Sequence, residues 1–204
     1  FDLLIKLPNK KISVIKKLKI PLLGIHNVRN SVAAAAVSLT IGISVSKIKS
    51  GLLNFKGVQR RFNKIFTYNN IEFYDDYAHH PTEIREVLDG VSKVYNEFDK
   101  VCIFQPHRIS RLKDLRKEFS FAFKKADTVL LCPIFTAGEK IKLGFDYLKF
   151  AKEIIDNSKV KLFMIKDINQ LAKFLKRNMH GKKIVIGMGA GSISTWMKKI
   201  PKLM

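Results

Sequence analysis

The chain has 204 residues, of which 47% are hydrophobic and 27% charged, a balance typical of a globular protein with one or two domains. Lys and Arg outnumber Asp and Glu by 38 to 17, so the net charge of +21 makes nucleic acid or another anionic surface a candidate partner. Only 8 of those 38 side chains are Arg, the residue that phosphate and base recognition favours, so a nucleic-acid function is the less favoured alternative.

The first residues of the chain and its two cysteines indicate the cellular compartment of the protein. The sequence begins with Phe1, has no basic-then-apolar leader, and contains no apolar run of the ~18 residues that a membrane span needs. Cys102 and Cys132 lie far apart in apolar runs without metal-binding spacing, which favours buried thiols in a reducing cytosol. We therefore expect part of a longer, cytoplasmic protein.

Residues 1–57 are expected to form a separate unit of short elements. The pattern predicts strands over Phe1–Leu7 and Ile12–Ile20 around an Asn9-Lys10 turn, an alanine-rich helix that begins near Asn27 and ends at Gly42, and a second helix within residues 44–55. The side chain of Asn27 suits the cap of the first helix. Together with Asn30 it could equally read the edge of an adenine, because amides donate and accept at once.

Residues 58–204 alternate apolar strands with amphipathic helices, which predicts an α/β fold with an open, mostly parallel sheet covered on both faces. The predicted strands are 65–68 and 71–74, paired as a hairpin around Asn69-Asn70, followed by 101–104, 128–132, 160–165 and 183–187. The predicted helices are one that opens at Pro81 and those over 112–125, 145–155, 168–177 and 193–199. In such sheets, ligands bind beyond the carboxyl ends of the strands.

Three polar segments follow strands of this predicted sheet: Asp75–Glu83, Gln105–Arg111 and Gly187–Ser192. In the second segment, Arg108 and Arg111 are three residues apart at an expected helix start, beside free backbone N–H groups. This arrangement predicts a site for a carboxylate or a phosphate. Two solvated arginines on a basic protein are the alternative.

The first segment combines carboxylates with imidazoles. Asp76 is expected to accept hydrogen bonds from the hydroxyls of a ligand. Asp, His and His could instead hold a divalent metal, but His79 and His80 are adjacent and would point in different directions. His80 also suits the cap of the helix that Pro81 opens.

The third segment, Gly187-x-Gly189-x-Gly191, follows a strand and opens a helix, as a dinucleotide-binding loop does. It lies on the last strand, with no acidic residue ~20 positions further on, so a tight turn with close helix–strand packing explains it equally well.

Taken together, these segments resemble the Mur ligases, the ATP-dependent amino-acid ligases of peptidoglycan synthesis. The matching segments are Gly24-Ile25-His26-Asn27-Val28-Arg29-Asn30, similar to G-x-H-N-x-x-N; Arg60-Arg61-Phe62, similar to the family's linker arginine; and Asp75–Glu83, Phe104–Arg108 and Ala137-Gly138-Glu139, which resemble the members that attach L-alanine. The sequence departs from the family pattern at flanking positions: Ile109, Leu112, Phe135-Thr136 and Ser192.

The resemblance implies a three-domain ligase. Residues 1–57 would be the tail of its central ATP-binding domain, and residues 58–204 its C-terminal Rossmann-like domain. It implies ATP and Mg²⁺ as cofactors and UDP-N-acetylmuramate and L-alanine as substrates, joined through an acyl phosphate. No G-x-x-x-x-G-K-[ST] occurs here, so the phosphate cradle and the Mg²⁺ ligands are expected upstream, and no metal site is expected in this chain.

By the same resemblance, Asn27 and Asn30 would contact adenine, Arg61 the ribose-phosphate side of the nucleotide, and Asp76 the ribose hydroxyls. The residues expected to line the L-alanine and acyl-phosphate side are Tyr77, His79, Arg108 and Arg111, supported by His107. A related ligase that attaches a whole tripeptide to the same sugar, a basic nucleic-acid-binding module and a non-catalytic Rossmann-like regulatory domain remain the alternatives.

Overall fold

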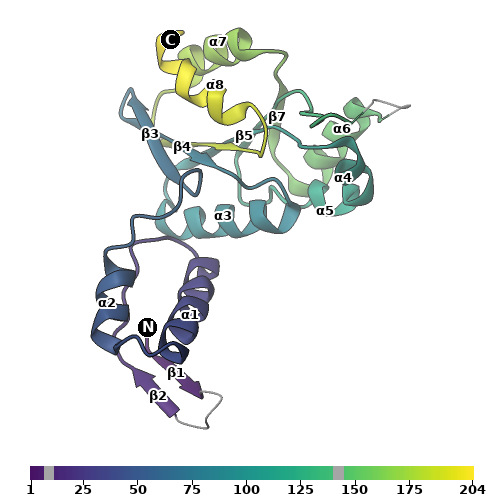
Figure 1. Cartoon of the computed structure of the whole chain (residues 1–204). Helices are drawn as coiled ribbons and strands as arrows, with labels where there is room; N and C mark the ends of the chain where they lie inside the picture. Colours follow the sequence, from purple (N-terminus) through teal and green to yellow (C-terminus); the bar gives the residue numbers. More distant parts are fainter. Residues whose placement is uncertain (7–11, 140–144) are drawn as a thin grey trace. The chain divides into compact units, whose positions relative to one another are not determined.

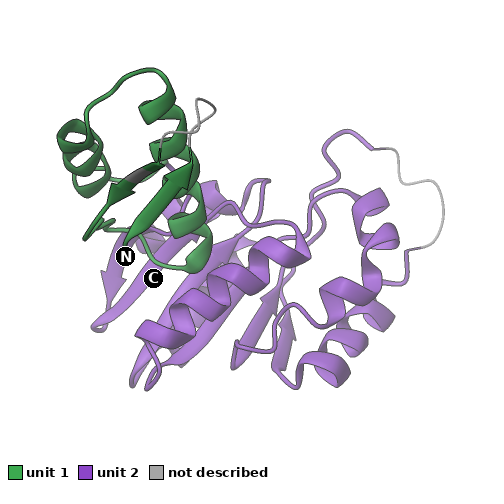
Figure 2. Cartoon of the chain, turned by 90° about the horizontal axis from the view of Figure 1, so that it is seen from below, with its two compact units in different colours: residues 1–58 green, residues 59–204 purple. Residues whose placement is uncertain are grey.

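The computed structural model describes residues 1–6, 12–139 and 145–204, shown in Figure 1. They divide into two compact units, Phe1–Val58 and Gln59–Met204, coloured green and purple in Figure 2. The sequence placed a domain boundary between residues 57 and 58, and the assignment of the first unit to an ATP-binding domain stays a prediction. Within the described ranges, no helix combines the length and the apolarity that crossing a bilayer requires.

The first unit contains a two-stranded antiparallel sheet and two helices. Its elements are β1 (Leu3–Lys6), β2 (Ile12–Ile15), α1 (Ile25–Thr40) and α2 (Val45–Leu53), and its core consists of Leu3, Ile15, Leu18, Ala35 and Ile48. The second strand ends at Ile15 rather than at Ile20, because Lys17 adopts a positive φ of 55° that breaks the extended run. The predicted Asn9-Lys10 turn lies outside the described residues.

Both ends of α1 are set by glycines. Gly24, rather than the predicted Asn27, is the N-cap residue, and the amide of Asn27 donates instead to the carbonyl oxygen of Leu23 at 2.7 Å. At the other end, Gly42 has a φ of +83° and donates its N–H to the carbonyl oxygen of Leu39, which confirms the predicted glycine stop.

The second unit is built on a six-stranded sheet in the order β3-β4-β8-β5-β6-β7. The strands are β3 (Asn63–Tyr68), β4 (Ile71–Asp76), β5 (Asp99–Phe104), β6 (Thr128–Leu131), β7 (Lys161–Met164) and β8 (Lys183–Met188). Only β3 pairs antiparallel, and it joins β4 through Asn69 and Asn70, whose positive φ angles of 48° and 61° suit a two-residue hairpin turn. The expected mostly parallel sheet is confirmed.

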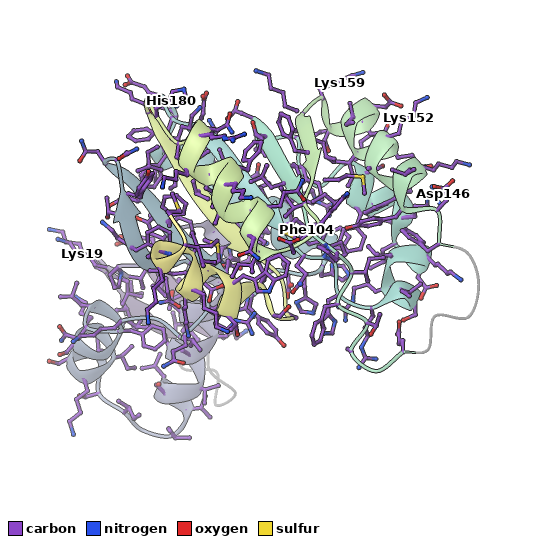
Figure 3. All side chains as sticks on the ribbon, turned by 90° about the horizontal axis from the view of Figure 1, so that it is seen from above. Lys19, Phe104, Asp146, Lys152, Lys159 and His180 are labelled. Atoms are coloured by element: carbon purple, nitrogen blue, oxygen red, sulfur yellow. The ribbon has the colours of Figure 1, made fainter. Side chains whose placement is uncertain are left out.

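Helices cover both faces of this sheet, as the alternating pattern predicted (Figure 1). They are α3 (Pro81–Val94), α4 (Ile109–Asp114), α5 (Arg116–Ser120), α6 (Tyr147–Ser158), α7 (Ile168–Asn178) and α8 (Ile193–Lys199), which runs into a short 3₁₀ turn, Ile200–Lys202. One core cluster joins α3, α5 and α6 to one face, and a second joins α7 and α8 to the other. Figure 3 shows the contrast within this unit: Phe104 lies inside, whereas Lys152 and Lys159 project outward.

The predicted helix over residues 112–125 is wrong in its bounds. Helix begins earlier, at Ile109, and breaks at Leu115 into α4 and α5. It ends at Ser120 because Ser158 of α6 takes over as the acceptor for the N–H of Phe123, at 3.2 Å. This tertiary contact overrides the helical periodicity of the segment.

Candidate functional site

Three neighbouring strands end together and bring the predicted polar segments to one edge of the sheet. Met188 at the end of β8 pairs with Asp76 at the end of β4 on one side and with Phe104 at the end of β5 on the other. An isolated parallel bridge between His107 and Phe135 adds the segment that follows β6. The carboxyl ends of the strands therefore present one continuous set of loops, as expected for a ligand site in such a sheet.

Four rings form a row along this edge, which we call the aromatic row: Tyr77, His79, His107 and Phe135. Successive ring centroids are 5.0 Å, 5.6 Å and 5.5 Å apart. Its two outer members, Tyr77 and Phe135, are each 37% exposed, so the row is open to a ligand. Three of its members were predicted as site residues, whereas Phe135 was named only as a departure from the family pattern.

His79 is held by its own loop and by the first turn of α3. Its Nδ1 lies 2.9 Å from the carbonyl oxygen of Tyr77 and 3.2 Å from the carboxylate of Glu83. The same carboxylate accepts the backbone N–H groups of His79 and His80 at 2.9 Å and 3.1 Å. Burial opposes the charge on Glu83, but these hydrogen bonds prevail and lower its pKa to about 2. Glu83 therefore stays ionised and fixes the imidazole of His79.

His80 has a different position from its neighbour. It is the N-cap of α3, where its Nδ1 accepts the N–H of Thr82 at 3.3 Å and Pro81 occupies the first helical position. The capping alternative is thus confirmed. Among the residues that the structure describes, no three side chains of His, Cys, Asp or Glu come together in a way that could hold a metal ion.

Asp76 is 2% exposed, and backbone N–H groups occupy both of its carboxylate oxygens. One oxygen accepts from Phe62 at 2.8 Å and the other from Ala78 at 2.7 Å. Burial raises the pKa of Asp76 to about 6, although the two hydrogen bonds and Arg61 oppose the shift. In this arrangement the carboxylate joins the segment before β3 to the end of β4. Its expected role towards ribose stays a prediction.

Arg60, which the sequence did not single out, connects three parts of the site. Its guanidinium donates to the carbonyl oxygen of Gly189 at 2.6 Å, lies 3.8 Å from the carboxylate of Asp75, and stacks 4.6 Å from the ring centre of Tyr77. The guanidinium of Arg61, which was predicted, lies 6.0 Å from the same ring. Both linker arginines therefore flank the Tyr77 end of the aromatic row.

Arg108 is exposed and has an unusual backbone. As the N-cap of α4 it adopts a φ of 69° and a ψ of 132°, in a region that costs a residue with a side chain about 1–3 kcal/mol. Its N–H donates to the carbonyl oxygen of Phe135 at 2.8 Å. Its guanidinium makes no hydrogen bond or ion pair with the described part of the chain, although its charge helps to lower the pKa of Glu139. The hydrogen-bonding groups of this guanidinium are therefore available to an anion.

The expectation of free N–H groups beside Arg108 and Arg111 is wrong. The carboxylate of Glu139 accepts the N–H of Ile109 at 2.7 Å and that of Ser110 at 3.2 Å, so the start of α4 already holds an anion. Arg111 lies in the last turn of α4, where its guanidinium approaches Nδ1 of His107 at 3.3 Å. The two arginines thus contribute guanidinium charge, and the helix start does not.

His107 lies half-buried among cations. Burial lowers its pKa below the usual value for histidine, and the charges of Arg111, His79 and Arg108 act in the same direction. A neutral imidazole can accept a hydrogen bond from Arg111 at Nδ1. The supporting role expected of His107 towards a substrate stays a prediction.

The glycine run after β8 is explained by close packing. A Cβ at Gly189, whose φ is +150°, would lie 2.8 Å from the backbone oxygen of Gln105, and a Cβ at Gly191 would lie 2.5 Å from the ring of Phe135. The side-chain oxygen of Gln105 accepts the first N–H of α8, from Ile193, at 2.9 Å. The start of α8 is therefore capped by the side chain of Gln105.

The predicted adenine contacts lie in the first unit, on the first turns of α1. The amide of Asn27 is half-buried and also lies 3.1 Å from Nε2 of His26, whereas Asn30 is exposed. Their contact with adenine stays a prediction. Cys102 and Cys132 are buried free thiols, as predicted, and burial raises the pKa of both.

Comparison with known proteins gives one family and consistent relatives. The family model described as "Mur ligase, glutamate ligase domain" matches residues 60–191. Over 203 residues the chain is 68% identical to UDP-N-acetylmuramate–L-alanine ligase of Pelagibacter ubique (strain HTCC1062), covering 100% of this chain and 44% of the relative. It is 36% identical to the enzyme of the same name from Brucella ovis, with 99% of this chain and 43% of the relative covered.

Solved structures agree with the sequence relatives. The crystal structure of UDP-N-acetylmuramate-alanine ligase from Thermotoga maritima superposes with a TM-score of 0.71 at 28% identity, covering 91% of this chain and 39% of that one. A murein peptide ligase from Psychrobacter arcticus, at 22% identity and a TM-score of 0.70, shares the fold; 94% of this chain and 39% of that one are covered. This chain thus spans less than half the length of the relatives that it matches.

Proposed function

Because the chain belongs to the Mur ligase family, we propose that it is the part of an ATP-dependent ligase that presents L-alanine to UDP-N-acetylmuramate in peptidoglycan synthesis. The observation that carries this proposal is the gathering of His79, His107, Arg108 and Arg111 at one edge of the sheet, with the Arg108 guanidinium free. The identity to enzymes named for this reaction supports the choice of L-alanine.

The proposed reaction places negative charge beside these cations. The lactyl carboxylate of the sugar attacks the γ-phosphorus of ATP, which gives an acyl phosphate and releases ADP. The amine of L-alanine then attacks the carbonyl carbon, and the tetrahedral intermediate collapses to an amide with loss of phosphate and of the amine proton. Fixed guanidinium groups stabilise the developing charge, and holding the amine close to the carbonyl carbon removes much of the entropic barrier.

Within this scheme Arg108 or Arg111 pairs with the carboxylate of L-alanine, because a guanidinium binds a carboxylate through two parallel hydrogen bonds. Tyr77 and His79 line the same side, and His107 orients Arg111 through the contact at 3.3 Å. The fixed imidazole of His79 and the exposed ring of Tyr77 support these assignments.

The nucleotide contacts are proposed separately for each unit. In the first unit, Asn27 and Asn30 are proposed to contact adenine, and in the second, Arg61 and Asp76 are proposed to face the ribose and phosphates. The described residues of this chain do not fit a Mg²⁺ site, since no three acidic or imidazole groups converge. The sequence also lacks a phosphate loop. We therefore propose that residues outside this chain hold the metal.

The setting of the reaction follows from its chemistry. Use of ATP and the presence of two buried free thiols support a cytoplasmic location. As a step of cell-wall synthesis, the reaction would contribute to cell shape and cell division.

An acceptor assay on the full-length enzyme tests this function. UDP-N-acetylmuramate and ATP are offered with isotope-labelled L-alanine or with the tripeptide, and the products are identified by mass spectrometry. We expect incorporation of L-alanine, with ADP and phosphate formed in equal amounts. Incorporation of the tripeptide alone would replace this proposal by the tripeptide ligase. Salt-dependent binding of duplex DNA without any response to ATP would favour a nucleic-acid-binding module. A protein that incorporates neither L-alanine nor the tripeptide and does not bind DNA would favour a regulatory domain.

A further inference from the structure

The carboxylate of Glu139 accepts three hydrogen bonds from the first residues of α4, and no pattern in the sequence indicated this contact. One carboxylate oxygen accepts the backbone N–H groups of Ile109 and Ser110 at 2.7 Å and 3.2 Å, and the other accepts the hydroxyl of Ser110 at 2.5 Å. These bonds, led by that from the Ser110 hydroxyl, lower the pKa of Glu139, so it stays ionised at neutral pH. Glu139, which follows β6, therefore fixes the start of α4, the helix that follows β5.

The backbone reverses direction just before Glu139, and one non-glycine residue of this reversal has a positive φ. Ala137 and Gly138 both have positive φ angles, of 52° and 84°, and the N–H of Glu139 donates back to the carbonyl oxygen of Thr136 at 3.1 Å. This reversal returns the carboxylate towards the start of α4. A non-glycine residue at positive φ needs compensating contacts, and the bonds of Glu139 supply them.

Arg108 lies between two attachments to this same segment. Its own N–H donates to the carbonyl oxygen of Phe135 at 2.8 Å, and the next two N–H groups, of Ile109 and Ser110, donate to Glu139. The ring of Phe135 stacks on His107 at an interplanar angle of 19°. The positive φ of Arg108 is therefore fixed from both sides by residues 135–139.

We propose that Glu139 is a positioning residue: it holds the backbone of Arg108 in the conformation that presents the guanidinium to the carboxylate of the incoming amino acid. The proposal rests on the function proposed above for Arg108. It assigns Glu139 no contact with substrate. Without the carboxylate, the first turn of α4 loses the acceptor for two N–H groups, and Arg108 is free to relax to a negative φ.

The test uses three substitutions of Glu139 and one control in the full-length enzyme. Glu139→Ala removes the acceptor, Glu139→Gln removes the charge at constant size, and Glu139→Asp keeps the charge on a shorter side chain. Glu118→Gln is the matched control, because Glu118 is an exposed carboxylate on the neighbouring helix α5 and makes no hydrogen bond with the described residues. Hydrogen–deuterium exchange across residues 105–115 is measured together with steady-state kinetics.

In Glu139→Ala and Glu139→Gln we expect the amides of Ile109 and Ser110 to exchange at least about tenfold faster, as for a lost helix cap. The KM for L-alanine should rise at least about tenfold, while the KM for ATP stays within about twofold. Glu139→Asp should restore part of both effects, and Glu118→Gln should behave as the unchanged enzyme.

Unchanged exchange would overturn the proposal, because Glu139 would then not hold this turn. Faster exchange with an unchanged KM for L-alanine would also overturn it and leave Glu139 as a helix cap alone. If the unsubstituted enzyme does not use L-alanine, the proposed function fails by itself. The exchange at Ile109 and Ser110 then still decides whether Glu139 holds the backbone of Arg108.

Discussion

The imidazole rings of His79 and His107 lie edge to face with their centroids 5.6 Å apart, although they follow different strands. One is fixed by Glu83 at the start of α3 and the other lies between Arg111 and Phe135. The two polar segments that the sequence predicted therefore meet on one side of the unit. Arg108, which directly follows His107, adds its free guanidinium to the same place.

Replacement of Arg108 by Ala in the full-length enzyme should lower turnover about 10²-fold or more, as expected when a charge-stabilising donor is lost. Arg177→Ala is the matched control, because Arg177 is an exposed arginine on α7 and should leave the rate unchanged. The measurement is steady-state formation of ADP with UDP-N-acetylmuramate and L-alanine. Near-normal rates for Arg108→Ala would remove this residue from the site.

Asp76 should make the stability of the protein depend on pH. Burial raises the pKa of its carboxyl from 3.8 to about 6 in the folded state, so the folded protein binds more protons than the unfolded chain between those values. The contribution of Asp76 to the free energy of unfolding therefore falls as pH rises from about 4 to about 6, by up to about 3 kcal/mol. It should stay constant below and above that range.

Urea unfolding at pH 4, 5, 6 and 7 measures this effect as the difference between the unsubstituted protein and Asp76→Asn. The unsubstituted protein should lose stability relative to the variant as pH rises through this range. Asp156→Asn, which changes an exposed carboxylate on α6, should show no such trend. If the free energies of unfolding of the unsubstituted protein and of Asp76→Asn changed with pH in the same way, the carboxyl of Asp76 would not titrate in this window.

Gly189 and Gly138 both have positive φ angles, but they differ in their surroundings. A Cβ at Gly189 would lie 2.8 Å from the backbone oxygen of Gln105, whereas a Cβ at Gly138 would have no atom of the described residues within 4 Å. Gly138→Ala should therefore cost about 1 kcal/mol through backbone strain alone. Gly189→Ala should cost at least about 2 kcal/mol more, because strain and overpacking act together. Thermal unfolding of both variants checks this order; equal losses would contradict it.

The 204-residue chain by itself should not hydrolyse ATP, because its sequence contains no phosphate loop and its described residues form no metal-binding cluster. A coupled assay for ADP, with the full-length enzyme as positive control, checks this expectation. Turnover by the isolated chain that persists after repeated purification would refute it.

Local signals in the sequence predicted the fold well. Asn69-Asn70 between two β-rich runs predicted the hairpin, and His80-Pro81 predicted the start of α3, because both depend on the backbone preferences of adjacent residues. The mostly parallel sheet followed from the alternation of strands and helices. The position of the predicted site residues, at the carboxyl ends of the strands, also followed from the rule that ligands bind at this edge of a parallel sheet.

Contacts between distant segments could not be predicted from one sequence. The bond from Phe123 to Ser158 shortens a helix whose periodicity continues, and Glu139 fills a helix start that follows a different strand. Arg60 has the same local signal as Arg61, and only the fold directs its guanidinium to Gly189. The pairing of Glu83 with His80 did have a local signal, since an acidic residue three positions after a cap is typical of a capping box.

The positive φ of Arg108 has a practical consequence for protein engineering. Glycine adopts a φ of 69° without strain, so Arg108→Gly would relieve the backbone at this position. A selection for thermostability alone would therefore reward the loss of the guanidinium on which the proposed catalysis depends. Attempts to raise the thermal stability of this protein should therefore leave Arg108 unchanged and substitute exposed loop residues remote from this edge of the sheet.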